Sequence, residues 1–138
     1  MRQLVYCFDI DGTLCTNNEG RYLEAEPVEG RVDHVNSLYD TGHVIKLFTA
    51  RGATTGMDWR SQTERQLAEW GLRYHELIFG KPHADFFIDD KAVHSDAYDW
   101  TSRPCLPRSL RRVITRSSST RSTCRPRSAS GRFSSRCM

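Results

Sequence analysis

Short apolar runs, each followed by polar residues, are the first pattern along the chain. Residues 4–8 (LVYCF) form a continuous apolar run that stops at a polar turn containing glycine, as expected of a strand buried on both faces. We expect this run to form the first and central strand of a sheet. Residues 43–49 (HVIKLFT) predict a second strand, and residues 77–79 and 86–88 predict two shorter ones.

Two segments between these runs carry a face of recurring residues at helical spacing. In residues 31–41 the face consists of Val32, Val35, Leu38 and Tyr39. In the second segment it consists of Trp59, Thr63, Leu67 and Trp70. Gly42 and Gly71 follow these segments and suit the C-terminal end of a helix, and Asp58 is a candidate N-cap for the second one.

Strands that alternate with helices predict an α/β protein with a Rossmann-like parallel sheet flanked by helices. Ligands of such sheets bind outside the carboxyl ends of the strands, and the polar clusters of this chain follow its predicted strands. Residues 15–29 are polar around an Asn-Asn-Glu-Gly centre. They suit a short hairpin or flap over the end of the first strand.

Charge divides the chain near Trp100. Residues 1–100 hold all 17 acidic residues and 10 of the 20 Lys and Arg residues, a net charge of −7 (10 minus 17). Residues 101–138 hold 10 Arg, 10 Ser and no acidic residue, with almost no aliphatic periodicity. Because such a segment cannot easily bury a core, we expect one domain in residues 1–100 and a disordered basic tail in residues 101–138.

Three interpretations fit this tail. A GC-rich coding region translated out of frame would yield Arg, Ser, Pro, Ala, Gly and Cys, and the composition favours this interpretation. The tail also fits a solvated extension. A third interpretation is an arginine- and serine-rich segment that binds nucleic acid or other polyanions, although repeated Ser-Arg dipeptides in register are absent.

Cysteine usage and hydropathy bear on the compartment. The five cysteines include no CxxC pair, so neither a disulfide framework nor a zinc knuckle is predicted, and a reducing compartment is the default. No apolar stretch approaches the roughly 20 residues of a membrane span. These features predict a cytoplasmic protein that makes no contact with a membrane.

The sequence FDIDGTL at residues 8–14 places two carboxylates, Asp9 and Asp11, directly after the first predicted strand. Three further elements follow in order: LFT at residues 47–49, Lys81 before a proline, and FIDD at residues 87–90. Together the four elements resemble the signature of the haloacid dehalogenase (HAD) superfamily. The resemblance implies a Mg²⁺-dependent phosphatase that works through an aspartyl-phosphate intermediate.

The resemblance assigns roles to the carboxylates. Asp9 is the nucleophile, because an aspartyl-phosphate divides hydrolysis into two easier steps. Asp11 protonates the leaving oxygen and then deprotonates the attacking water. The family's Mg²⁺ ligands map to the Asp9 carboxylate, the backbone carbonyl of Asp11 and an aspartate of the last motif. That aspartate is Asp89, with Asp90 direct or through water.

The cationic and hydroxyl groups suit phosphate binding. Thr49 offers a hydroxyl and a backbone N–H to a phosphate oxygen, and Lys81 offers a positive charge that also offsets the carboxylates. The resemblance assigns both residues to the phosphate. Arg51 closely follows the second predicted strand and is placed to reach the phosphate or the leaving group, an inference without a fixed role in the family.

The spacing of the motifs bears on the substrate. Residues 15–29 and 50–80 leave room for a flap and one crossover helix, with none for an inserted cap domain. Residues 49–52 (TARG) with Asp58 and Trp59 are similar to those of small capless phosphatases associated with capsule and surface-polysaccharide synthesis. The resemblance implies a sugar phosphate or related small metabolite. A second subunit in a homo-oligomer is one way to exclude water from a capless site.

Three alternatives stay open. The phosphatase half of polynucleotide kinase–phosphatases is also capless, so a polynucleotide 3′-phosphate is a second substrate class. A response-regulator receiver uses a similar residue set, but its phosphoacceptor follows the third strand, whereas Asp9 follows the first predicted strand. The last alternative is a non-enzymatic remnant of a HAD phosphatase, because the unusual tail is compatible with a damaged gene product.

Overall fold

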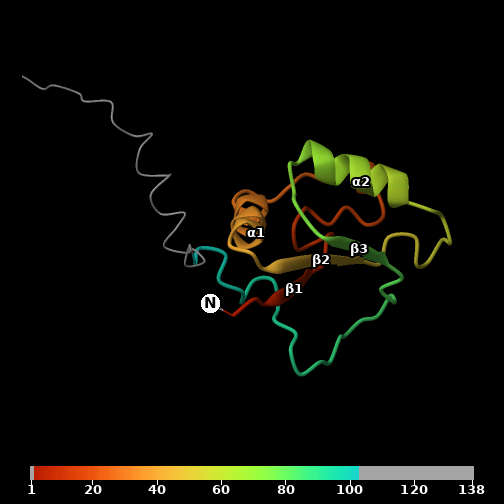
Figure 1. The fold of residues 1–138 in the computed structure, drawn as a ribbon. Helices are drawn as coiled ribbons and strands as arrows, with labels where there is room; N and C mark the ends of the chain where they lie inside the picture. Colours follow the sequence, from red (N-terminus) through yellow and green to blue (C-terminus); the bar gives the residue numbers. More distant parts are fainter. Residues whose placement is uncertain (1, 103–138) are drawn as a thin grey trace, which may run out of the picture. The chain divides into compact units, whose positions relative to one another are not determined.

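The computed structural model describes residues 2–102, in which three strands form a parallel sheet (Figure 1). The strands are β1 (Val5–Phe8), β2 (Val44–Thr49) and β3 (Glu76–Phe79), in the order β1-β2-β3. Helix α1 (Arg31–Asp40) connects β1 to β2, and helix α2 (Arg60–Glu69) connects β2 to β3. The prediction of an α/β protein with a parallel sheet is confirmed.

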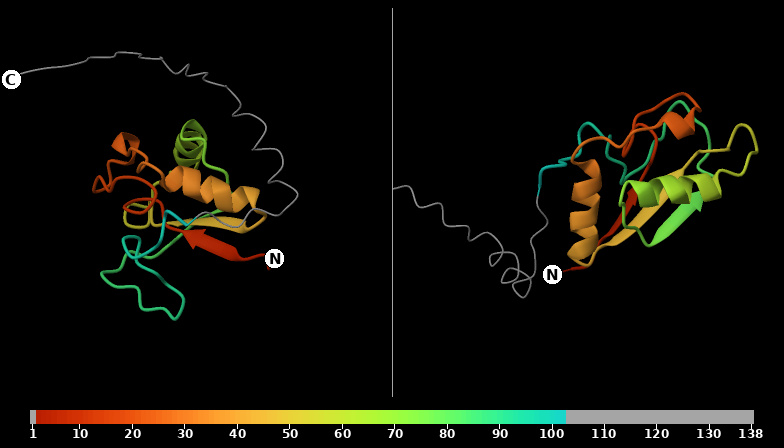
Figure 2. Two further views of the ribbon diagram at one scale, coloured as in Figure 1. Left: turned by 90° about the vertical axis from the view of Figure 1, so that its left-hand side faces the viewer. Right: turned by 90° about the horizontal axis from the view of Figure 1, so that it is seen from above.

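Both helices lie on the same side of the sheet, and much of the segment after β3 runs on the opposite side (Figure 2, left). Helix α1 buries Val35 and Leu38 against this side, and α2 buries Leu67. Alternate positions of β2 are fully buried, as the period of a strand requires: Ile45, Leu47 and Thr49. The core therefore lies between the helices and β2.

The predicted helix ends are close to the observed ones. Gly42 and Gly71 adopt φ angles of +89° and +68°, a conformation that favours glycine just after a helix. At the start of α2, Trp59 takes the N-cap position. The Asp58 side chain, one residue earlier than that position, accepts a hydrogen bond from the backbone N–H of Arg60 at 2.9 Å, so it still satisfies an N–H of the first turn.

Residues 15–29 fold back as the predicted flap. The backbone N–H of Thr16 donates to the carbonyl of Glu26, and that of Val28 donates to the carbonyl of Leu14, each at 2.9 Å. Between these paired sides the chain forms a short 3-10 helix, η1 (Tyr22–Glu24). Backbone hydrogen bonds between its two sides therefore hold the flap close to the end of β1.

Three predictions about strands are wrong within residues 2–102. Residues 86–88 form no strand, and β1 is an edge strand of the described sheet rather than its centre. Strand β1 is also not buried on both faces, since Val5 is 64% exposed. The side chains of Phe86 and Ile88 are 86% and 99% exposed. No helix follows this three-residue run within the described residues to cover it, so too little burial offsets the entropy of ordering a strand.

The chain returns to the core at Tyr98 and Trp100. Their ring centroids lie 6.0 and 5.8 Å from that of Phe8, and the Tyr98 hydroxyl lies 3.0 Å from Nε2 of His34. Residues up to Trp100 thus take part in packing, while the predicted tail lies outside the described residues from residue 103 on. In the described part of the chain, neither helix has the length and apolar character needed to cross a bilayer.

Candidate active site

The end of β1 presents two half-buried carboxylates. Asp9 and Asp11 flank Ile10, whose side chain is fully buried. The Ile10 carbonyl accepts hydrogen bonds from the backbone N–H groups of Thr13, Leu14 and Cys15, at 3.2, 2.9 and 3.1 Å. Gly12, at φ +79°, makes this reversal without strain from a side chain. The tight turn fixes the backbone of Asp11.

Asp9 is paired with Lys81, which is distant in sequence. Nζ of Lys81 lies 3.4 Å from Oδ1 of Asp9. The backbone N–H of Lys81 donates to the carbonyl of Thr49 at 3.1 Å, so the end of β2 holds the lysine in place. The ammonium group also lies 4.6 Å from the ring centroid of Phe87. The structure thus brings together three of the predicted site residues.

Burial and positive charge act on Asp9 in opposite directions. Burial raises the pKa of the Asp9 carboxyl above its usual range, while Lys81 and the backbone N–H of Ile10 lower it by less. The surroundings therefore do not fully compensate the negative charge of Asp9. A carboxylate in this position would be stabilised by a further cation.

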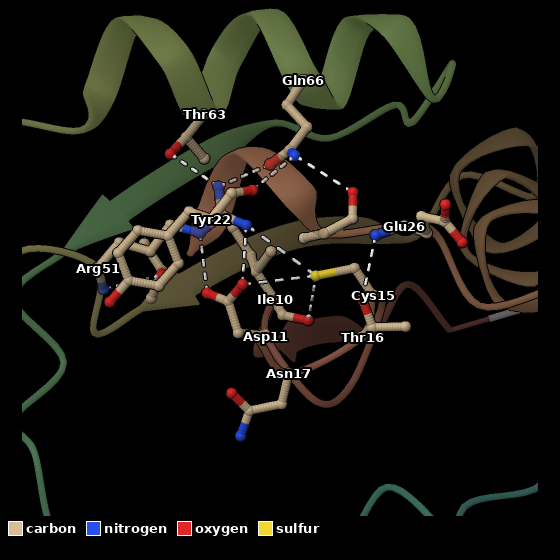
Figure 3. A network of polar contacts seen from close by, with 12 residues as sticks. Ile10, Asp11, Cys15, Thr16, Asn17, Tyr22, Glu26, Arg51, Thr63 and Gln66 are labelled. Carbon is tan, nitrogen blue, oxygen red and sulfur yellow. Dashed lines mark hydrogen bonds and ion pairs between the residues drawn. The ribbon is translucent and has the colours of Figure 1, made fainter. Parts of the chain in front are cut away.

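Asp11 forms a two-pronged ion pair with Arg51 (Figure 3). Nε of Arg51 donates to Oδ2 of Asp11, and Nη2 donates to Oδ1, both at 2.8 Å. The Arg51 side chain is only 2% exposed. Fork-shaped pairs of this kind fix the plane of the carboxylate as well as its position.

The other donors of Arg51 bind elements on both sides of the site (Figure 3). Nη1 donates to Oγ1 of Thr63 at 3.2 Å and to Oε1 of Gln66 at 2.8 Å, both on α2. Nη2 also lies 4.0 Å from Sγ of Cys15. Gln66 in turn donates to the carbonyl of Tyr22 in the flap at 2.9 Å, so one network joins the turn after β1, α2 and the flap.

Thr49 and Arg51 are tied to one another at the end of β2. Thr49 is fully buried, and its Oγ1 accepts a hydrogen bond from the backbone N–H of Arg51 at 3.1 Å. A hydroxyl that accepts one hydrogen bond can still donate another. The Thr49 hydroxyl can therefore still donate a hydrogen bond to a phosphate oxygen. The side chain of Arg51, which was expected to reach the phosphate or the leaving group, donates to Asp11 instead.

The last two predicted carboxylates stay apart from the first two. Asp89 and Asp90 are exposed, and Oδ1 of Asp89 accepts a hydrogen bond from the backbone N–H of Lys91 at 2.7 Å. This bond, together with a hydrogen bond to Asp90, lowers the pKa of Asp89. Within residues 2–102, no three His, Cys, Asp or Glu side chains lie close enough to hold a metal ion. As they lie, these residues do not fit a complete magnesium shell.

A cavity of about 270 Å³ lies beside the network, where the loop after β2 meets the end of β3. Its walls include Arg51, Trp59, Arg60 and Phe79. The volume is slightly below the roughly 300–1,000 Å³ of sites for drug-sized ligands. The cavity is therefore large enough for a small ring or chain only.

Sequence reasoning missed two partners of Arg51. Thr63 was expected only to pack on the face of a helix, and Gln66 was not singled out. The signal is their spacing of three residues on α2, which places two polar side chains on the same helix face as the buried Leu67. A polar pair on a packed face indicates a buried polar partner.

Comparison with known proteins bears on the fold alone. No family model and no curated protein matches the chain. The crystal structure of an MCSG target from Vibrio cholerae is similar, with a TM-score of 0.60 and 24% sequence identity. The similarity covers 68% of this chain and 85% of that chain. It supports the α/β fold described above and carries no activity with it.

Proposed function

We propose that this chain is a phosphomonoester hydrolase of the HAD type, with Asp9 as its nucleophile. The observation that carries the proposal is the pairing of Asp9 with Lys81, 3.4 Å apart, at the carboxyl ends of β1 and β3. The pair supplies a nucleophile and a cation for the phosphate at the edge where parallel sheets bind ligands. Asp11 lies two residues from the nucleophile on a turn that fixes its backbone.

The proposed reaction has two steps. Asp11 enters the first step with a proton on its carboxyl group. A carboxylate oxygen of Asp9 attacks phosphorus, the bond from phosphorus to the leaving oxygen breaks, and the leaving oxygen takes that proton from Asp11. Water then attacks the aspartyl-phosphate, Asp11 takes a proton from that water, and the bond between Asp9 and phosphorus breaks. Inorganic phosphate leaves, and both carboxyl groups return to their starting states. Lys81 offsets the negative charge of the phosphate oxygens, and Thr49 donates hydrogen bonds to them.

A sugar phosphate or related small metabolite is the substrate class that the site supports best. The cavity beside Arg51 measures about 270 Å³, which suits a single ring as the leaving group. The connections from β1 to α1 and from β2 to α2 contain no inserted domain, which supports a capless site. A polynucleotide 3′-phosphate is the second candidate, because a capless site can also receive the end of a polymer.

The proposed hydrolase uses Mg²⁺, because the motifs resemble those of Mg²⁺-dependent HAD phosphatases. Mg²⁺ prefers oxygen ligands and retains several waters, and the uncompensated charge of Asp9 would favour it. Binding would require Asp89 or Asp90 to approach Asp9 from the exposed position they hold here. The chemical steps above are carried by this chain's own side chains.

Activity of the full chain tests the proposal. Sugar phosphates, nucleoside monophosphates and 3′-phosphorylated oligonucleotides would be incubated with Mg²⁺ or with EDTA, and phosphate release measured. We expect hydrolysis of at least one sugar phosphate, and trapping of an acyl-phosphate at Asp9 by hydroxylamine. Asp9→Asn should abolish both, because an amide cannot form the acyl-phosphate. Asp33→Asn, a matched loss of charge at an exposed position of α1, should retain both.

Two results would count against the proposal. Retention of activity in Asp9→Asn would remove Asp9 as nucleophile. A folded wild-type chain that hydrolyses no substrate, with or without Mg²⁺, would favour the non-enzymatic remnant instead.

A further inference from the structure

The guanidinium of Arg51 has no donor left for a substrate in the described structure. A guanidinium has five N–H donors. Two bind Asp11, two bind the side chains of Thr63 and Gln66, and the fifth faces Sγ of Cys15 at 4.0 Å. With 2% of its side chain exposed, Arg51 is enclosed by its partners.

We propose that Arg51 is a positioning residue, which holds the carboxylate of Asp11 in the orientation needed for proton transfer and does not bind the phosphate. The inference rests on the proposed function, in which Asp11 is the group that moves the proton. A two-pronged pair fixes the carboxylate plane, which a single hydrogen bond or a lysine would leave free to rotate.

The geometry also distinguishes the two oxygens of Asp11. Oδ1 accepts a hydrogen bond from Nη2 of Arg51 and lies 3.5 Å from Sγ of Cys15. Among residues 2–102, Oδ2 accepts a hydrogen bond from Nε of Arg51 alone. A carboxylate oxygen has two acceptor positions, so Oδ2 keeps one that faces no protein donor. Oδ2 is therefore the oxygen that exchanges the proton with the leaving group and with water.

Helix α2 and the flap set the position of Arg51 in turn. Thr63 and Gln66 hold the Nη1 side of the guanidinium, and Gln66 also binds the Tyr22 carbonyl. The Tyr22 ring centroid lies 4.9 Å from Cζ of Arg51, a cation–π contact that adds to the enclosure. Asp11 is thereby linked to α2 without touching it, which allows an indirect test.

The test compares three variants of the full chain. Arg51→Lys removes the two-pronged pair. Thr63→Val removes one support of Arg51 and keeps the shape of the side chain, without any change at Asp11. Arg73→Lys is the control, because Arg73 forms the same kind of fork with Asp40, at 2.5 and 2.7 Å, in an exposed position outside the network. Circular dichroism and thermal melting check the fold of each variant.

Positioning predicts a separation of kinetic constants. In Arg51→Lys, kcat should fall about 100-fold, as expected for a misplaced catalytic group, while KM and the affinity for inorganic phosphate stay unchanged. Thr63→Val should lower kcat in the same direction but by less, and Arg73→Lys should leave it unchanged. The losses should be larger for alkyl phosphates than for nitrophenyl phosphate, whose leaving group needs no proton.

Other outcomes would overturn the inference. Weaker phosphate binding with an unchanged kcat would make Arg51 a phosphate ligand. Equal losses of kcat for the alkyl and nitrophenyl phosphates would reduce Arg51 to a structural role. Full activity in a folded Thr63→Val protein would do the same, and this second test remains usable if Arg51→Lys fails to fold. A wild-type chain that hydrolyses nothing would instead overturn the proposed function, and this role with it.

Discussion

At the scale of single residues, the ionised carboxylate of Asp9 is destabilised by its burial. A carboxylate that is partly buried, with one lysine at 3.4 Å, keeps a raised pKa. The folded protein therefore disfavours the ionised form that the proposed role of Asp9 as nucleophile needs. Sites that carry such destabilised groups commonly trade stability for activity.

The first prediction concerns the stability of Asp9→Asn. Because the folded-state pKa of Asp9 is raised, its favourable contribution is fully present below its ordinary value of 3.8 and is lost as the pH rises through the folded-state pKa. In EDTA at neutral pH, Asp9→Asn should therefore unfold at a higher temperature than wild type, and the difference should shrink as the pH falls toward 3.8. Melting curves across this range check it, with Asp33→Asn as the control.

A lower melting temperature for Asp9→Asn at neutral pH would show that the pair with Lys81 outweighs the burial of the charge. The same variant would still lack activity, so the two measurements separate stability from catalysis.

Candidate site residues were predictable where they depend on local sequence. Asp9, Asp11 and Lys81 could be identified from their order and spacing, and two of them, Asp9 and Lys81, meet in the structure. The partner of Arg51 could not be predicted, because Asp11 lies 40 residues away and the other supports lie 12 and 15 residues away on α2. A motif gives the residue type at a position, whereas a buried fork depends on how several elements pack together.

At the scale of elements, the loop after β2 is held in a tight form by glycine. Gly52 has φ +79°, and a Cβ at this position would lie 2.2 Å from the carbonyl oxygen of Met57. The backbone N–H of Gly56 donates to the Gly52 carbonyl at 2.8 Å. The loop directly follows Arg51, so its shape bears on the Asp11–Arg51 pair.

The second prediction uses two glycines of this loop. Gly56→Ala should cost about 1–2 kcal/mol, because it places a side chain in a left-handed conformation, and a Cβ there meets nothing within 4 Å. Gly52→Ala should cost more, since the added Cβ also collides with the Met57 backbone. It should also reduce phosphatase activity by shifting Arg51. Urea unfolding and kcat measurements check both variants, and equal effects would contradict the close approach at Gly52.

The helices were predictable from periodicity and the first three strands from short apolar runs, because each contributes to one core. The run at residues 86–88 has a similar apolar character but remains exposed. A strand also needs a partner edge and a cover for its faces, and neither requirement can be read from the three residues themselves. The expected position of Asp89 beside Asp9 depended on that strand, and Asp89 instead lies exposed after β3.

At the scale of the whole molecule, packing extends to Trp100 and its neighbours. The Trp100 indole N–H donates to the carbonyl of Ser95 at 2.7 Å, and Arg31 lies over its ring at 4.8 Å. Asp99 accepts hydrogen bonds from the backbone N–H groups of Thr101 and Ser102 at 2.9 and 3.2 Å. Residues 98–102 therefore form contacts that a shortened chain should keep.

The last prediction compares two shortened chains. A chain that stops after Ser102 keeps Tyr98, Trp100 and every acidic residue, and it loses all ten arginines of residues 101–138. It should keep the melting temperature and the proposed phosphatase activity of the full chain. It should lose mainly the expected affinity for polyanions, which salt would already weaken. A chain that stops after Ser95 also loses the two aromatic rings that pack on Phe8. It should be less stable by up to about 3–5 kcal/mol, the range for loss of a large aromatic side chain.

Insolubility or inactivity of the chain that stops after Ser102, beside an active full chain, would make the tail structural and would contradict the out-of-frame interpretation.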